Sequence, residues 1–201
     1  MRGIYAILNE ERDPVELARA ILDGGVRILQ YRAKAGIVKE HALQLRSLTR
    51  ARNALFIIND DWRAARTFDA DGVHLGPDDT DLSQLAAIRA NVGDRLIGFS
   101  CGTVEEARGA QAAGADYAGV GAVFATGSKS DAGEPLGIEG LQRVAAATTL
   151  PVAAIGGIGA ENLPAVRATG VAMAAMISAL AGASDPAAAA ARLVRIWESG
   201  S

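Results

Sequence analysis

The sequence predicts an α/β fold, a single (β/α)8 TIM barrel that spans residues 1–201. Eight short apolar runs recur along the chain, and helical segments with start and stop signals lie between most of them. A length of about 200 residues suits the smallest barrels of this kind. The alternative is an open doubly wound sheet, but Leu8-Asn9-Glu10 after the first run lacks the glycine-rich turn of nucleotide-binding sheets.

The eight apolar runs are expected to form parallel strands. Several are continuously apolar, as in residues 152–155, which suits strands that are buried on both faces. Gly, Pro or Asp bounds each run, and the runs begin near Ile4, Arg27, Leu55, Val73, Leu96, Tyr117, Val152 and Val171.

The segments between these runs carry helix signals. Asp13-Pro14 and Asp185-Pro186 each place an N-capping residue before a proline that suits the first helical position. Thr103 and Glu106 have the spacing of a capping box, and another helix is expected to begin at Asp81. The long connection 122–137 is predicted to be a binding loop or lid.

Composition limits the classes of function. The net charge is −3 and no basic stripe is present, so we expect no nucleic-acid partner. The longest apolar run, near residues 171–183, is shorter than the roughly 20 residues of a membrane span, and the one cysteine, Cys101, fits the cytoplasm. We therefore expect a cytoplasmic protein with no membrane partner. The sequence does not decide between a monomer and a homo-oligomer.

Charged residues follow the second, third and fourth predicted strands, where the active sites of such barrels lie. Gln30, Arg32 and Lys34 alternate and share one face, which predicts a phosphate or pyrophosphate site; solvated charge is the alternative. Asp60 and Asp79 follow neighbouring strands, and such a carboxylate pair suits Mg²⁺, although turn acids are the alternative.

The remaining nucleophiles and bases are given structural roles. His74 is expected to be an interior packing residue and His41 to lie on a surface helix, and no histidine pair has the spacing of zinc ligands. Ser100 and Cys101 have no base nearby in the sequence. We therefore expect Ser100 to form hydrogen bonds and Cys101 to be a buried thiol.

The last three predicted strands end in a second group of phosphate-binding candidates. Gly156-Gly157 follows the seventh strand and Ser178 the eighth, a position where backbone amides of barrels often bind phosphate; a tight turn is the alternative. Thr126 and Lys129 lie in the long loop, which is either a phosphate-binding loop or a polar surface loop. Two sites for phosphorylated small molecules in one barrel suggest a joining reaction.

Taken together, these segments resemble the thiamine phosphate synthase family (thiamine-phosphate pyrophosphorylase) over nearly the whole chain. The matching pieces occur in order at the strand ends. They are residues 30–34, 58–60, 71–76 with Asp79, 98–100, 126–129, 155–158 and 177–178.

The resemblance implies a Mg²⁺-dependent transferase of thiamine biosynthesis. It implies that hydroxymethylpyrimidine pyrophosphate loses its pyrophosphate in a dissociative displacement and is joined to hydroxyethylthiazole phosphate. The implied metal ligands are Asp60 and Asp79, and the implied catalytic residues are Arg32, Lys34, Ser100 and Lys129. The implied substrate-binding residues are Gln30, Tyr31, Arg32, Ala33, Lys34, Asn59, Ser100, Thr126, Gly127, Ser128, Lys129, Gly157, Ile177 and Ser178.

The chain departs from the family pattern at three places. Gly102 stands where the family usually has His, Pro77 replaces a common Gln, and residues 125–128 replace a Pro-Thr-x-Thr-like loop. Two alternative functions stay open, a thiazole tautomerase on a related barrel and a non-catalytic sensor of phosphorylated ligands. The retained Asp60 and Asp79 favour the synthase, because neither alternative has an evident need for a metal-binding pair.

Overall fold

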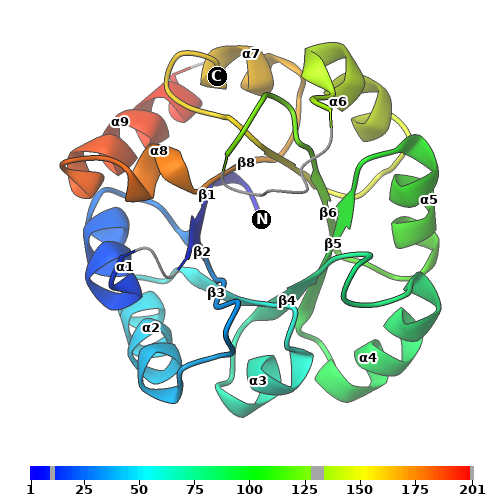
Figure 1. Cartoon of the computed structure of the whole chain (residues 1–201), viewed down its shortest axis with the longest axis horizontal. Helices are drawn as coiled ribbons and strands as arrows, with labels where there is room; N and C mark the ends of the chain where they lie inside the picture. Colours follow the sequence, from blue (N-terminus) through cyan, green and yellow to red (C-terminus); the bar gives the residue numbers. More distant parts are fainter. Residues whose placement is uncertain (10–11, 128–133, 200–201) are drawn as a thin grey trace.

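The computed structural model describes residues 1–9, 12–127 and 134–199, and its centre is a closed barrel of eight parallel strands inside a ring of helices (Figure 1). Each strand pairs with the next one along the chain, and β8 pairs with β1 to close the barrel. The predicted fold class is therefore confirmed. The strands are β1 (Gly3–Leu8), β2 (Ile28–Tyr31), β3 (Leu55–Asn59), β4 (Gly72–Leu75), β5 (Leu96–Cys101), β6 (Tyr117–Val120), β7 (Val152–Ile155) and β8 (Met173–Met176).

The helices pack around this barrel, and α9 closes the ring against α1. None of the helices in the described ranges is long and apolar enough to cross a membrane. The helices are α1 (Pro14–Asp23), α2 (Lys39–Ala51), α3 (Trp62–Thr67), the 3-10 turn η1 (Leu82–Gln84), α4 (Leu85–Val92), α5 (Val104–Ala112), α6 (Gly137–Ala145), α7 (Leu163–Ala168), α8 (Ser178–Ala181) and α9 (Pro186–Glu198).

Helix capping follows the sequence signals. Asp13 accepts hydrogen bonds from the backbone N–H groups at the start of α1, and Asp185 accepts one at the start of α9. Thr103 and Glu106 form the predicted capping box of α5. Asp81 caps the 3-10 turn η1, which leads directly into α4, so the predicted start of that helix is a tighter turn.

Two apolar layers result from the alternation of side chains along the strands. The outer layer joins the barrel to the helices and includes Leu8, Leu29 and Phe56. The inner layer fills the barrel with residues from several strands, so the barrel is a packed core. The buried inner residues are Tyr5, Ile7, Ile28, Ile57, Tyr117, Ala153, Met173 and Ala175.

The eighth strand is the one whose predicted start differs most from the structure. It begins at Met173, two residues after the predicted Val171, because the sheet hydrogen bonds start only where Ala172 donates to Val152. Met173 and Ala175 lie on the inner face of the barrel, and a shift of two residues in the start of the strand does not change that face. Strand alternation therefore sets which residues reach the centre of the barrel.

Candidate active site

A pocket of about 370 Å³ opens at the carboxyl ends of the strands. This is the end of the barrel at which the active sites of such folds lie. Every strand contributes at least one residue to its wall, and these residues are Ile7, Gln30, Asn59, His74, Ser100, Cys101, Gly119, Ile155, Ala175 and Met176.

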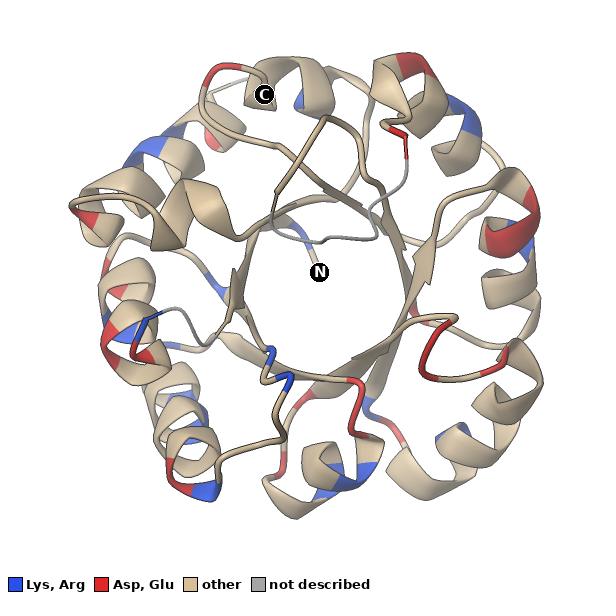
Figure 2. Ribbon diagram, viewed as in Figure 1, with Lys and Arg blue, Asp and Glu red and all other residues tan. Residues whose placement is uncertain are grey.

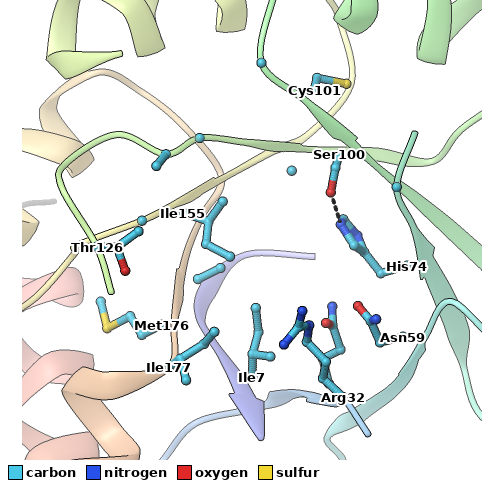
Figure 3. Close-up of a pocket in the computed structure, with 18 of the residues that line it drawn as sticks. Ile7, Arg32, Asn59, His74, Ser100, Cys101, Thr126, Ile155, Met176 and Ile177 are labelled. Carbon is cyan, nitrogen blue, oxygen red and sulfur yellow. Dashed lines mark hydrogen bonds between the residues drawn. The ribbon is translucent and has the colours of Figure 1, made fainter. Parts of the chain in front are cut away.

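The pocket has two unlike sides. Figure 3 shows Arg32, Asn59, His74 and Ser100 on one side. On the opposite side lie Thr126, Ile155, Met176 and Ile177 (Figure 3). We call the first side, from β2 to β5, the polar half, and the second side, from β6 to β8, the glycine-rich half.

Of the three residues expected to share one face at the β2 exit, Gln30 and Arg32 line the pocket. Tyr31, Ala33 and Lys34 are not among the described residues that line the pocket. Tyr31 faces the helices, where its hydroxyl lies 3.3 Å from Nδ1 of His41. Beyond the end of β2 at Tyr31, the Arg32 N–H still donates to the Leu8 carbonyl of β1, but Lys34 lies in the turn that follows, so the alternation stops before it.

Asp60 and Asp79 both line the polar half, as the sequence predicts. Asp60 has a left-handed backbone, with φ of 63°, and its N–H donates to the His74 carbonyl at 2.8 Å. Asn59 donates a hydrogen bond to the Asp60 carboxylate. Asp79 follows a turn in which its N–H bonds to the carbonyl of Gly76 at 3.1 Å. The two carboxylates therefore stand after the paired strands β3 and β4 on defined backbone.

His74 is a pocket residue whose contact with Ser100 the sequence did not predict. Its Nε2 lies 3.0 Å from Oγ of Ser100, 26 residues away in the sequence, and its Nδ1 lies 3.1 Å from the Tyr117 hydroxyl. Two glycines make room for these rings. A Cβ at Gly98 would lie 2.5 Å from Nδ1 of His74, and one at Gly119 would lie 2.9 Å from its Cε1. Glycines on neighbouring strands are the signal that could have indicated a large interior side chain.

The loop after β7 forms the floor of the glycine-rich half. Gly156 and Gly157 have positive φ values of 103° and 63°. A Cβ at Gly157 would lie 2.5 Å from the carbonyl oxygen of Ala125, so only glycine fits there. Thr126, Ile177 and Ser178 line the same half, whereas Gly127 is not part of the wall formed by the described residues. Ser128 and Lys129 lie outside the described residues.

Comparisons with known proteins show the family of this chain. A family model described as thiamine monophosphate synthase matches residues 4–180. The chain belongs to this family. The predicted resemblance is thereby confirmed.

Relatives within the thiamine monophosphate synthase family match nearly the whole chain. The chain is 46% identical over 199 residues to the thiamine-phosphate synthase of Archaeoglobus fulgidus, covering 96% of this chain and 92% of that one. It is 45% identical over 201 residues to the thiamine-phosphate synthase of Geobacillus kaustophilus, covering 95% and 90%. The solved thiamine phosphate pyrophosphorylase of Pyrococcus furiosus superposes with a TM-score of 0.89 at 38% identity, covering 98% of this chain and 96% of that one.

Cys101 and Gly102, the latter one of the three expected departures from the family pattern, line the pocket beside the polar half. Glu106 lines the pocket here and accepts hydrogen bonds from the backbone N–H groups of Gly102, at 2.5 Å, and Thr103, at 3.0 Å. Burial, and then the charge of Glu106, raises the pKa of the Cys101 thiol to about 12. Cys101 is therefore a neutral thiol at ordinary pH and not a nucleophile.

Proposed function

We propose that this chain is a thiamine phosphate synthase, which joins hydroxymethylpyrimidine pyrophosphate to hydroxyethylthiazole phosphate and releases pyrophosphate. The observation that carries the proposal is that one pocket has a polar half beside a glycine-rich half. Two differently built sites for anionic groups suit a reaction that brings two phosphorylated molecules together. Holding the two molecules close together and in the right orientation would then supply much of the rate enhancement of the joining reaction.

The polar half suits the pyrimidine pyrophosphate. Arg32 offers a planar, permanently charged fork to phosphate oxygens, and Asn59 offers an amide beside it. Asp60 and Asp79 are hard oxygen donors on adjacent strand exits, and we propose that they hold Mg²⁺. Among the described residues, no three His, Cys, Asp or Glu side chains form a metal-binding group. Two carboxylates still fit, because Mg²⁺ takes few protein ligands and fills its other positions with water and phosphate oxygens.

The glycine-rich half suits the thiazole phosphate. Gly157 brings backbone close to the pocket without a side chain, and Ser178 and Thr126 add hydroxyl groups that can donate to phosphate oxygens. Ile155 and Ile177 add apolar surface against which a thiazole ring can pack. From the loop outside the described residues, Ser128 is proposed to join this site and Lys129 to contact the pyrophosphate in the polar half.

The proposed chemistry needs positioned charge more than a protein nucleophile. The bond between the pyrimidine methylene carbon and the pyrophosphate oxygen breaks, and its electron pair leaves with pyrophosphate. The electron-rich aminopyrimidine stabilises the resulting cation, and the thiazole nitrogen lone pair then forms the new carbon–nitrogen bond. Mg²⁺, when bound, would neutralise charge that develops on the leaving group. Arg32 acts on the same charge, while Ile7 and Ile155 keep apolar surface beside the cation.

An end-point assay tests the proposal. Purified protein is incubated with both phosphorylated precursors, with Mg²⁺ or with EDTA, and thiamine phosphate is measured. We expect product only when both precursors and Mg²⁺ are present. Binding of both precursors without product would favour a sensor, and isomerisation of a thiazole carboxylate phosphate would favour a tautomerase.

The lone thiol at Cys101 fits a reducing compartment, and we propose a cytoplasmic location.

A further inference from the structure

A chain of buried hydrogen bonds crosses the interior of the barrel beneath the pocket. Nε2 of Gln30 lies 2.7 Å from the Tyr5 hydroxyl, which lies 2.9 Å from the Tyr117 hydroxyl. The Tyr117 hydroxyl lies 3.1 Å from Nδ1 of His74, whose Nε2 lies 3.0 Å from Oγ of Ser100. Both ends of this chain, Gln30 and Ser100, line the pocket, while the two tyrosines are buried below it.

The donors and acceptors give the chain one direction. The Gln30 amide donates to the Tyr5 oxygen, and the buried Tyr5 proton then goes to the adjacent Tyr117 oxygen, because buried hydroxyl groups need acceptors. Burial raises the pKa of both phenols, so both keep their protons. Tyr117 then donates to Nδ1 of His74. A neutral imidazole that accepts at Nδ1 carries its proton on Nε2, and that N–H donates to Ser100.

We propose that Tyr5, Tyr117 and His74 are positioning residues that fix the hydrogen-bonding direction of the two pocket residues at the ends of the chain. Ser100 accepts from His74, so its own O–H is free to be donated to a ligand. Gln30 uses its amide nitrogen below, so its carbonyl oxygen is the acceptor for a ligand. If the chain ran in the opposite direction, the Ser100 O–H would donate to His74 and the Gln30 carbonyl oxygen would turn to accept from Tyr5, so neither would be presented to the ligand.

This arrangement selects an aminopyrimidine, an inference that rests on the proposed function. An aminopyrimidine offers an amino N–H donor and a ring-nitrogen acceptor, which match the Gln30 oxygen and the Ser100 hydroxyl. The oxo analogue, with a carbonyl and a ring N–H in these places, presents the opposite pattern. Sites that pair buried hydrogen-bonding groups with a ligand discriminate strongly against analogues that leave them unpaired.

The first test is the tautomer of His74, measured by side-chain ¹⁵N NMR on the full-length protein. The protein has two histidines, so the spectrum of a His41→Gln sample identifies the signals of His74. We expect the proton on Nε2 and an unprotonated Nδ1. A proton on Nδ1 would overturn the proposal, because the chain would then run in the opposite direction. This measurement needs no turnover, so it distinguishes failure of this proposal from failure of the proposed function.

The second test is kinetic and uses Tyr117→Phe, which keeps the ring and removes the central hydroxyl. We expect kcat/KM for the pyrimidine pyrophosphate to fall about tenfold, the size of one lost buried hydrogen bond. The KM for the thiazole phosphate is expected to stay unchanged, and the preference for the amino over the oxo analogue is expected to shrink. If Tyr117→Phe is poorly folded, Tyr5→Phe takes its place. It interrupts the same hydrogen-bond chain one bond earlier and is expected to have the same kinetic effects.

The control is Thr49→Val in α2, which also removes a fully buried hydroxyl, one bonded to the carbonyls of Leu45 and Arg46. It is expected to lower stability and to leave the amino-over-oxo preference unchanged. If Tyr117→Phe and Thr49→Val had the same effect on that preference, the chain would have only a structural role and the proposal would be wrong.

Discussion

The two halves of the pocket use different parts of the polypeptide. In the polar half, side chains in the connections after β2, β3 and β4 carry charge, and Figure 2 shows blue segments after β2 and red segments after β3 and β4. In the glycine-rich half, the connections after β7 and β8 are mostly uncharged, and backbone forms much of the wall (Figure 2). One half therefore depends on ionisable groups and the other on the path of the main chain.

Because of this difference, the two halves tolerate different kinds of substitution. A charged site loses function when a charge is neutralised, even if the shape of the site is kept. A backbone site loses function when a side chain intrudes, even if no charge changes. The two halves can therefore be disabled separately, with substitutions that differ in kind.

Neutralising Asp60 is expected to have the largest effect. Asp60→Asn keeps the size of the side chain, and Asn tolerates the left-handed backbone at φ of 63°. Loss of the carboxylate is expected to lower turnover about 100-fold, the scale of one electrostatic contact to a developing charge. Turnover measured across a range of Mg²⁺ concentrations checks this, and a shifted Mg²⁺ requirement is expected as well.

The control for that variant is Asp94→Asn, which neutralises an exposed aspartate in the turn after α4. Its turnover and Mg²⁺ requirement are expected to match those of the unmodified protein. If Asp60→Asn behaved like Asp94→Asn at limiting Mg²⁺, the carboxylate would have no part in metal binding.

Adding one methyl group to the glycine-rich half is expected to have the next largest effect. In Gly157→Ala the new Cβ would lie 2.5 Å from the Ala125 carbonyl oxygen, so the loop must shift. We expect a rise of about tenfold in the KM for the thiazole phosphate and a loss of about 1–3 kcal/mol of stability. Gly159→Ala is the matched control, because a Cβ there meets nothing within 4 Å. Equal kinetics for the two variants would show that the backbone path at Gly157 is not needed.

The smallest effect concerns Cys101, which lies at the pocket wall next to the polar half. Its pKa is raised from 9.0 to about 12 by burial and by Glu106, so the unfolded thiol ionises first as the pH rises. The unfolded state then binds fewer protons than the folded state, and stability falls above about pH 9. Between pH 8 and 10, the unmodified protein is expected to lose about 1 kcal/mol more than Cys101→Ser, as measured by urea unfolding. Parallel pH profiles would mean that the thiol is not held protonated in the fold.

The fold and the polar half of the pocket were predictable because the sequence signals for them are local. Apolar runs, helix caps and carboxylates after strands all lie within a few residues of one another, as Asp13 and Asp60 illustrate. Alternation along β2 also predicted that Gln30 and Arg32 share the pocket. It failed for Lys34 because only Arg32 still bonds to the neighbouring strand after β2 ends, and Lys34 lies in the turn that follows.

The interior contacts were not predictable in the same way. His74 meets Ser100 and Tyr117 only because β4, β5 and β6 pair in one register around a closed barrel. The numbers of residues that separate His74, Ser100 and Tyr117 in the sequence do not indicate that their strands pair. Gly98 and Gly119, which leave room for the two rings, were the available signal.

The division of the pocket into two half-sites is tested most directly by titration calorimetry with each precursor separately. Hydroxymethylpyrimidine pyrophosphate with Mg²⁺, and hydroxyethylthiazole phosphate, are titrated into the unmodified protein, Asp60→Asn and Gly157→Ala. We predict that Asp60→Asn weakens only the first ligand and that Gly157→Ala weakens only the second. If each variant weakened both ligands equally, the two halves would form one undivided site and the account would be contradicted.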